Sequence, residues 1–313
     1  MSMLRPNPAA YLPVKPKRRW AKFTFIAIIL LLVTGLLTVS GVVGWKLAHP
    51  AKRPIALTPD QFQLPYQDIQ FSSRLDQTNL RGWLIPSGES KRIVIFAHGY
   101  RMNRSAEKPA LPTAKALHDA GIATLLFDFR NSGESDGVMT SVGQFEKSDL
   151  LGAVDFAKSK GYEQIGLMGF SMGAATTLLT APESPDVAAV VADSPFSDLR
   201  PYLEENLPVW SNLPSFPFTP LILWEIPLVA GVDLEQVRPI QTIRQLQQKP
   251  VLLIHTKGDD KIPVQHSEKL KASVDSAATE LWVTSGTRHV GSFEELQGQY
   301  LEKVTQFFNA HLQ

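Results

Sequence analysis

The sequence predicts an α/β fold: a doubly wound, mostly parallel eight-stranded sheet with helices on both faces, preceded by one transmembrane helix. Three observations carry this prediction. Six short apolar runs recur between residues 92 and 283, most of them separated by a helix-length stretch. Two earlier runs alternate apolar and polar residues, and one uncharged run, Phe23 to Trp45, lies near the amino terminus. Continuous apolar runs are typical of parallel strands buried on both faces, and alternating runs of strands with one exposed face.

The amino-terminal segment divides into a basic tail, residues 1–22, and a predicted transmembrane helix, residues 23–45. As a helix, the uncharged run spans about 34 Å, which is enough to cross a bilayer. The tail holds six of the 31 basic residues and no acidic one. The positive-inside rule therefore predicts a single-pass protein of the cell membrane with a cytoplasmic amino terminus and an extracytoplasmic domain. A cleaved signal peptide, whose apolar region is usually shorter, and a buried core helix are the alternatives.

Residues 46–61, with Pro50, Pro54 and Pro59, are expected to form a stiff tether, and residues 62–313 the globular domain. Within that domain, Asp68–Ser73 and Leu80–Pro86 predict an antiparallel hairpin at the edge of the sheet. The apolar runs predict six further strands: Arg92–His98, Ala123–Phe129, Gln164–Gly169, Ala188–Asp193, Pro250–His255 and Glu280–Val283. Helices are expected at 105–119, 142–160, 172–181, 264–275 and 293–311.

One long interval interrupts this alternation of strands and helices. More than fifty residues separate Asp193 from Pro250, and they are rich in proline and aromatic residues. An insertion of that length inside a compact domain is usually a functional lid or an element of its own. We expect residues of about 197–248 to form a cap over a pocket. A packed helical excursion without a catalytic part is the alternative.

Charge and cysteine content exclude several classes of protein. With the six basic residues of the tail set aside, 25 of the 31 remain against 30 acidic residues, a net charge of about −5. A nucleic-acid-binding surface needs a basic footprint, so no nucleic acid is expected as a partner. The chain has no cysteine, which excludes disulfides, a thiolate metal site and a cysteine nucleophile.

The segment Gly169-Phe170-Ser171-Met172-Gly173 fits the pattern G-x-S-x-G. It follows a predicted strand and precedes a predicted helix, which is the context this motif requires. A tight turn there lifts the serine hydroxyl above the carboxyl edge of the sheet. The motif predicts that Ser171 is a nucleophile.

A serine hydroxyl needs a base within hydrogen-bond reach and a carboxylate that orients the base. Of the seven histidines, His289 lies in the loop between the last strand and the final helix, which opens at the same sheet edge as Ser171. The acid is expected from another loop at that edge. Asp259 and Asp260 follow the penultimate predicted strand, and Asp193 ends an earlier one, so all three are candidates.

The developing negative charge of the transition state needs hydrogen-bond donors. The backbone N–H groups of Met172, directly after the nucleophile, and of Tyr100, after a predicted strand end, are expected to form an oxyanion hole. His98 and Gly99 precede Tyr100 and are expected in the wall of the pocket.

Residues 62–313 resemble the α/β-hydrolase superfamily, and most of all its bacterial lid-bearing serine esterases and lipase-like proteins. The resemblance rests on His98-Gly99-Tyr100, Asp128 to Ser135, the elbow at Gly169 to Gly173, Asp193-Ser194-Pro195-Phe196, the D-x-x-I-P spacing of Asp259 to Pro263, and His289. By that spacing the resemblance implies Asp259 as the acid, with Asp260 and Asp193 as alternatives.

The resemblance implies a membrane-anchored serine hydrolase that cleaves a small-molecule carboxylic ester through an acyl-enzyme, without a metal or an organic cofactor. Apolar residues of the insertion, including Leu221, Leu223 and Trp224, fit an apolar, lipid-like acyl group or contact with lipid, and a packed core is the alternative. A serine aminopeptidase or acylaminoacyl peptidase, and a thioesterase, share this fold and are the alternatives. A non-enzymatic binding protein is a further alternative, because a fold alone does not determine function.

Overall fold

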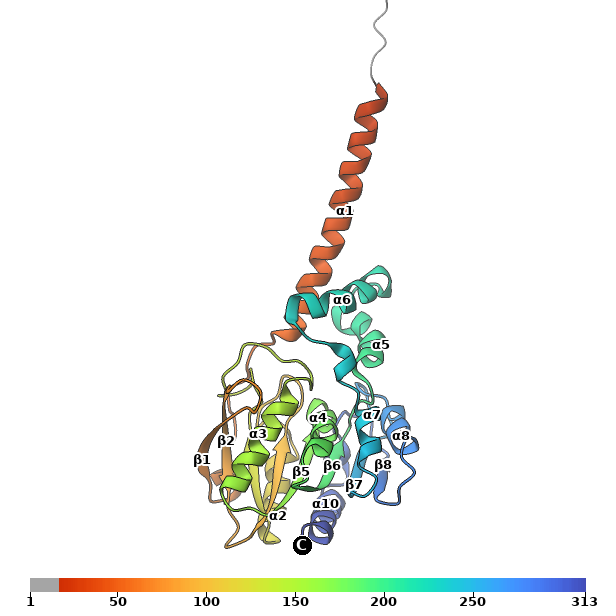
Figure 1. Ribbon diagram of the computed structural model, residues 1–313. Coiled ribbons are helices and arrows are strands. Elements are labelled where there is room, and N and C mark those ends of the chain that lie inside the picture. Colours follow the sequence, from red (N-terminus) through yellow and green to blue (C-terminus); the bar gives the residue numbers. More distant parts are fainter. Residues whose placement is uncertain (1–16) are drawn as a thin grey trace, which may run out of the picture.

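The computed structural model describes residues 17–313, with side chains from Trp20 onward. A compact sheet-and-helix body lies at one end, and a long amino-terminal helix rises from it (Figure 1). Residues 1–16, most of the basic tail expected from the sequence, lie outside the described residues.

An eight-stranded sheet forms the centre of the body, in the order β1-β2-β4-β3-β5-β6-β7-β8. β2 is antiparallel to both of its neighbours, β1 and β4. All other neighbouring strands in this order are parallel to each other. The doubly wound, mostly parallel sheet predicted from the sequence is therefore confirmed. The strands are β1 Gln67–Ser72, β2 Asn79–Ile85, β3 Arg92–Ala97, β4 Ala123–Phe127, β5 Gln164–Phe170, β6 Val187–Asp193, β7 Val251–Thr256 and β8 Thr279–Thr284.

Helices cover both faces of this sheet. Side chains of α2 (Ala110–Asp119) and α10 (Gln297–His311) pack on one face. Those of α3 (Glu146–Ser159), α4 (Met172–Thr180) and α8 (Gln265–Ala272) pack on the other. Burial on both faces explains why β3 to β7 are continuously apolar. The single helix expected at 293–311 is instead broken into α9 (Ser292–Glu295) and α10, because Leu296 has non-helical backbone angles, φ −129° and ψ 43°.

The amino-terminal helix α1 runs from Lys17 to Ala48, beyond both ends of the predicted segment 23–45. Trp20 to Ala48 is long and apolar enough to cross a membrane, with a mean hydropathy of 2.7 over an 18-residue window. Up to Val39 its apolar side chains are mostly exposed, whereas Ser40, Gly44 and Ala48 are buried. The last turns of α1 therefore belong to the packed body.

The segment after α1 is bonded to the body instead of standing free as a tether. The side-chain amide of Asn103 donates to the carbonyls of Arg53 and Pro54, and that of Asn131 to the carbonyl of Pro50. A short 3-10 helix, η1 (Pro59–Phe62), then leads into β1. These bonds fix the end of α1 relative to the sheet.

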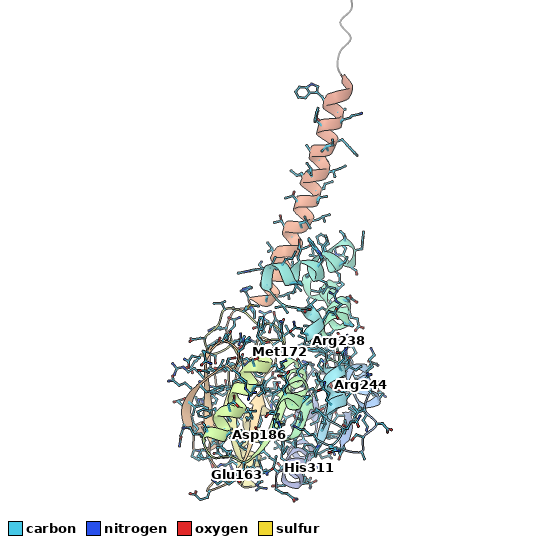
Figure 2. The ribbon with its side chains drawn as sticks, in the orientation of Figure 1. Glu163, Met172, Asp186, Arg238, Arg244 and His311 are labelled. Carbon is cyan, nitrogen blue, oxygen red and sulfur yellow. The ribbon has the colours of Figure 1, made fainter. Side chains whose placement is uncertain are left out.

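The insertion between β6 and β7 is helical and lies at the carboxyl ends of the parallel strands (Figure 1). Its two main helices are α5 (Leu199–Ser211) and α6 (Ser215–Ala230), and α6 lies against the lower end of α1. Met172 lies at the end of the sheet that faces this cap, whereas Glu163 and His311 lie at the opposite end (Figure 2). Shorter turns complete the set: η2 (Ala181–Glu183), η3 (Leu234–Gln236), α7 (Pro239–Thr242) and η4 (Ile243–Gln245).

Candidate active site

Ser171 lies in the turn between β5 and α4. Its backbone has φ 55° and ψ −118°, a conformation that costs a non-glycine residue free energy and is characteristic of a nucleophile elbow. The strain is held by bonds on both sides of the turn: the Ser171 N–H donates to the carbonyl of Asp193 at 2.8 Å, and its carbonyl accepts from Ala175. The hydroxyl is therefore presented at the amino-terminal end of α4.

The two glycines of the elbow have no room for a side chain. A Cβ at Gly169 would lie 2.3 Å from the carbonyl oxygen of Gly173. A Cβ at Gly173 would lie 2.0 Å from the carbonyl oxygen of Ala97, at the end of β3. Close approach of β5, α4 and β3 therefore requires glycine at both positions.

His289 and Asp259 form the hydrogen-bonded pair next to this turn. The Nδ1 of His289, in the loop after β8, lies 2.7 Å from Oδ2 of Asp259, in the loop after β7. Ser171 and His289 line the same cavity. No hydrogen bond joins the two within residues 17–313, and such contacts are often long until a substrate binds.

The carboxylate of Asp259 has contacts in addition to the one with His289. Its Oδ1 accepts from the backbone N–H groups of Lys261 and Ile262, both at 2.9 Å. Nε2 of His255 lies 3.4 Å from Oδ2. Burial alone would raise the pKa of Asp259, but the contacts with His255, His289 and the Ile262 N–H outweigh it and hold the pKa well below its usual range. The carboxylate stays ionised and fixed in orientation.

The other two candidate acids have different contacts. Asp260 accepts from the backbone N–H of His289 at 3.1 Å, so it supports the loop and not the imidazole. Asp193 is fully buried and accepts from the hydroxyls of Tyr300, at 2.7 Å, and Ser194, at 3.0 Å. Burial raises the pKa of Asp193 to about 6 against these hydrogen bonds. Among the three carboxylates, Asp259 is the one bonded to the imidazole.

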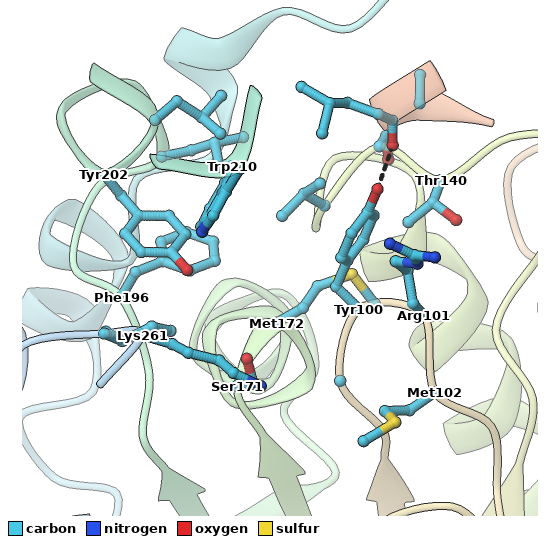
Figure 3. A pocket seen from close by; sticks show the side chains of 18 of the residues that line it. Tyr100, Arg101, Met102, Thr140, Ser171, Met172, Phe196, Tyr202, Trp210 and Lys261 are labelled. Atoms are coloured by element: carbon cyan, nitrogen blue, oxygen red, sulfur yellow. Dashed lines mark hydrogen bonds between the residues drawn. The ribbon is translucent and has the colours of Figure 1, made fainter. Parts of the chain in front are cut away.

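Two backbone N–H groups beside Ser171 are free to bind an oxyanion. Neither Tyr100 N–H, in the loop after β3, nor Met172 N–H, at the start of α4, donates to another described residue. Figure 3 shows both residues beside Ser171. The partial positive charge at the amino-terminal end of α4 also favours negative charge there.

The loop after β3, which holds the expected oxyanion donor Tyr100, is fixed by hydrogen bonds to buried side chains. The N–H of Gly99 donates to Oε1 of Glu107 at 2.9 Å. The pKa of the Glu107 carboxyl is raised, mainly because the group is buried. Nδ1 of His98 bonds the Gly99 carbonyl at 2.8 Å, and Nε2 accepts from the N–H of Phe129 at 3.0 Å. Gly99 lines the cavity, whereas His98, expected from the sequence in the same wall, does not, because its ring is turned inward by these two bonds. Sequence reasoning missed Glu107, which lies in an irregular loop with no motif.

A cavity of about 610 Å³ lies above Ser171, between the sheet edge and the cap (Figure 3). Most of its lining is apolar, and its charged residues are Arg53, Arg101, Lys261 and Glu107. Gly44, Leu47 and Ala48 of α1 also line it, which the sequence did not predict. Apolar lining from the cap comes from Phe196, Leu199, Tyr202, Leu203, Trp210, Ile226, Val232 and Leu234. Within residues 17–313, no group of three or more His, Asp or Glu side chains is arranged to hold a metal ion.

Among the proteins with related sequences or folds, some are named as esterases or α/β hydrolases and two as polyketide transferases. The chain is 32% identical over 238 residues to the uncharacterized protein YqkD of Bacillus subtilis, covering 74% of this chain and 75% of that one. The Pyrococcus furiosus esterase Pf2001 superposes with a TM-score of 0.72 at 27% identity, covering 86% of this chain and 99% of the esterase. The α/β hydrolase GrgF from Penicillium shares the fold, with a TM-score of 0.63 at 23% identity over 80% of this chain and 99% of GrgF.

The model of the prolyl oligopeptidase family matches residues 112–313, a range that holds Ser171, Asp259 and His289. The match covers well over half of the chain, and the fold superposes on that of the Pyrococcus furiosus esterase. The chain is therefore a hydrolase of the α/β-hydrolase superfamily and belongs to the prolyl oligopeptidase family.

Proposed function

We propose that the protein is a membrane-anchored serine hydrolase that cleaves carboxylic esters through an acyl-enzyme. One observation carries the proposal: His289, whose Nδ1 lies 2.7 Å from Oδ2 of Asp259, lines the same cavity as a serine held in a strained elbow. The anchor is α1, with the amino terminus in the cytoplasm and residues 62–313 outside it. A small-molecule ester is the proposed substrate, by analogy with the esterase of Pyrococcus furiosus.

The proposed reaction has two steps. Ser171 Oγ attacks the ester carbonyl carbon while Nε2 of His289 takes the hydroxyl proton, and Asp259 stabilises the imidazolium and fixes its orientation. The N–H groups of Tyr100 and Met172 donate to the oxyanion. Collapse breaks the bond to the alcohol, which leaves with the proton from His289. Water then attacks the acyl-enzyme with His289 as the base, releasing the acid and restoring Ser171.

A peptidase is the second candidate, because the matching family is named after one. The cavity charges argue against an aminopeptidase. A free substrate amine needs a carboxylate partner, and the one acidic residue in the lining, Glu107, is buried and already bonded to the Gly99 N–H. Arg53, Arg101 and Lys261 in the same lining would repel an ammonium group. Ester cleavage is therefore preferred to removal of a free amino-terminal residue.

A substrate panel separates the candidates. The full chain in detergent is given 4-nitrophenyl esters, free aminoacyl nitroanilides and acetylated aminoacyl nitroanilides. The proposal expects rapid release of nitrophenol and little nitroaniline. Faster cleavage of the acetylated anilides would establish an acylaminoacyl peptidase instead, and faster cleavage of the free ones an aminopeptidase.

A labelling experiment addresses the proposed orientation. Because the chain has no cysteine, a single exposed thiol introduced as Ser159→Cys gives one reactive site in the domain. A membrane-impermeant maleimide added to intact cells should label it without detergent. Labelling only after permeabilisation would contradict an extracytoplasmic domain. The unmodified chain is the control for background.

A further inference from the structure

The end of α1 is packed against the cap. A Cβ built at Gly44 would lie 3.3 Å from Cγ1 of Ile226 on α6, so the two helices approach closely through a position that lacks a side chain. Ser40, one turn earlier in α1, is fully buried. Cap and anchor therefore form one packed unit (Figure 1).

The same end of α1 forms part of the cavity above Ser171. Gly44, Leu47 and Ala48 line it, and the carbonyl of Leu47 accepts from the hydroxyl of Tyr100 at 2.6 Å (Figure 3). The carbonyl of Ala48 accepts from the N–H of Thr140, another lining residue, at 2.7 Å. The carboxyl-terminal end of the proposed membrane anchor thus forms part of the cavity wall.

The length of α1 sets the depth of the cap relative to a bilayer. The part of α1 that stands clear of the body, from Trp20 to Val39, is about 30 Å long, which matches the hydrocarbon core. If this part spans the bilayer, Ser40 to Ala48 and α6 lie at the membrane surface. The part of the cavity that Gly44 and Leu47 line then lies at the same level.

The cap surface at that level is apolar and nearly free of charge. From Asn206 to Val232 the only charged residue is Glu225, and it is buried. Phe216 is 82% exposed and Trp224 61%. The other large apolar residues exposed in this stretch are Val209, Trp210, Leu228 and Val229. Such a surface is unfavourable in water and favourable at the boundary of headgroups and acyl chains.

Only a thin wall separates this surface from the cavity. Trp210 is 41% exposed and also lines the cavity, so one side chain contacts both spaces. Ile226 lines the cavity from α6, one residue away from the buried Glu225 and two from the exposed Trp224. An acyl chain that enters the cavity from this surface meets a lining that is mostly apolar.

From these contacts we propose that the cap rests in the membrane surface and that the cavity takes its ester directly from the bilayer. The substrate class is a membrane-resident lipid ester, whose acyl chain enters between the end of α1 and the cap. This inference rests on the proposed ester hydrolysis by Ser171 and adds the source of the substrate and the surface that recognises it.

The test compares an ester in the bilayer with one in water. The full chain is reconstituted into phosphatidylcholine vesicles that contain 4-methylumbelliferyl oleate, and 4-nitrophenyl acetate is assayed in the same vesicles. Phe216→Asp and Trp224→Asp place a charge on the cap surface without touching the cavity lining. Leu75→Asp, 56% exposed in the turn between β1 and β2, is the matched control.

The wild type and Leu75→Asp should cleave both esters. Each cap variant should lose about tenfold or more of its oleate cleavage, because a charge resists insertion, and keep its acetate cleavage. Three results overturn the inference: cap variants that cleave oleate like the wild type, cap variants that lose both activities together, or a wild type that cleaves acetate but not vesicle-bound oleate. Failure of the wild type on acetate contradicts instead the proposed ester hydrolysis on which the inference rests.

Discussion

The hydroxyl of Tyr100 donates a hydrogen bond to the backbone carbonyl of Leu47, with 2.6 Å between the two oxygens. Tyr100 belongs to the loop after β3 and Leu47 to the last turn of α1, so the bond joins the proposed oxyanion loop to the proposed anchor. Burial raises the pKa of Tyr100 to about 12, which keeps the hydroxyl protonated and able to donate. The position of one proposed oxyanion donor thus depends on the amino-terminal helix.

Replacing this tyrosine tests that dependence. Tyr100→Phe keeps the backbone N–H and the ring but removes a bond that contributes about 1 kcal/mol, so kcat/KM for a nitrophenyl ester should fall roughly fivefold. Most of the change is expected in kcat, because the loop holds the transition-state oxyanion. Tyr162→Phe, a half-buried tyrosine outside the cavity lining, is the control. Equal kinetics of Tyr100→Phe and the wild type would show that the bond does not position the loop.

Substitution of the neighbouring aspartates tests which one orients His289. Asp259→Asn keeps the shape but removes the charge that faces Nδ1, and kcat should fall by about 10⁴-fold. Asp260→Asn changes only an acceptor of a backbone N–H and should cost no more than about tenfold. Steady-state kinetics on one ester measure both. The reverse order of the two losses would assign the acid to Asp260.

The buried His98 predicts a loss of stability in acid. Burial lowers the pKa of His98 to about 4, against an ordinary value of 6.5. The unfolded chain therefore binds this proton more tightly, so the stabilising effect of the neutral ring is complete above pH 6.5 and is lost as the pH falls toward 4. From His98 alone, the free energy of unfolding should drop by about 2 kcal/mol between about pH 7 and pH 5.

Chemical denaturation in detergent at the two pH values measures this drop in the wild type and in His98→Gln. The variant is expected to be less stable at neutral pH and to lose less on acidification. His266, whose pKa burial also lowers to about 4, contributes in the same direction, and His266→Gln gives an independent comparison. An equal pH dependence of the wild type and His98→Gln would rule out this role of His98.

The strands could be predicted from sequence because their signal is local. Burial on both faces demands unbroken apolar runs, so the runs at residues 92–98 and 164–169 lie within a residue of the ends of β3 and β5. The elbow is equally local, since it needs Gly169 and Gly173 two residues on either side of Ser171. Asp259 and His289 come from loops after adjacent strands, and the topology alone brings these loops together.

The role of α1 in the cavity could not be predicted in this way. An uncharged run looks the same whether its side chains face lipid or protein, and the contact of Leu47 with Tyr100 joins segments 53 residues apart. The inward turn of His98 has a similar cause. The ring of His98 turns inward because its Nε2 accepts from the N–H of Phe129. These two residues follow β3 and β4, and they come together only when the two strands pair.

Turnover by Ser171→Ala tests the central claim most directly. The full-length variant and the wild type are compared on 4-nitrophenyl butyrate in the same detergent, with circular dichroism as the check on folding and Ser159→Ala, an exposed serine at the end of α3, as the control. The account predicts that Ser159→Ala matches the wild type and that a folded Ser171→Ala loses about 10³-fold or more in kcat. Equal turnover by Ser171→Ala and the wild type would contradict a serine nucleophile at this elbow.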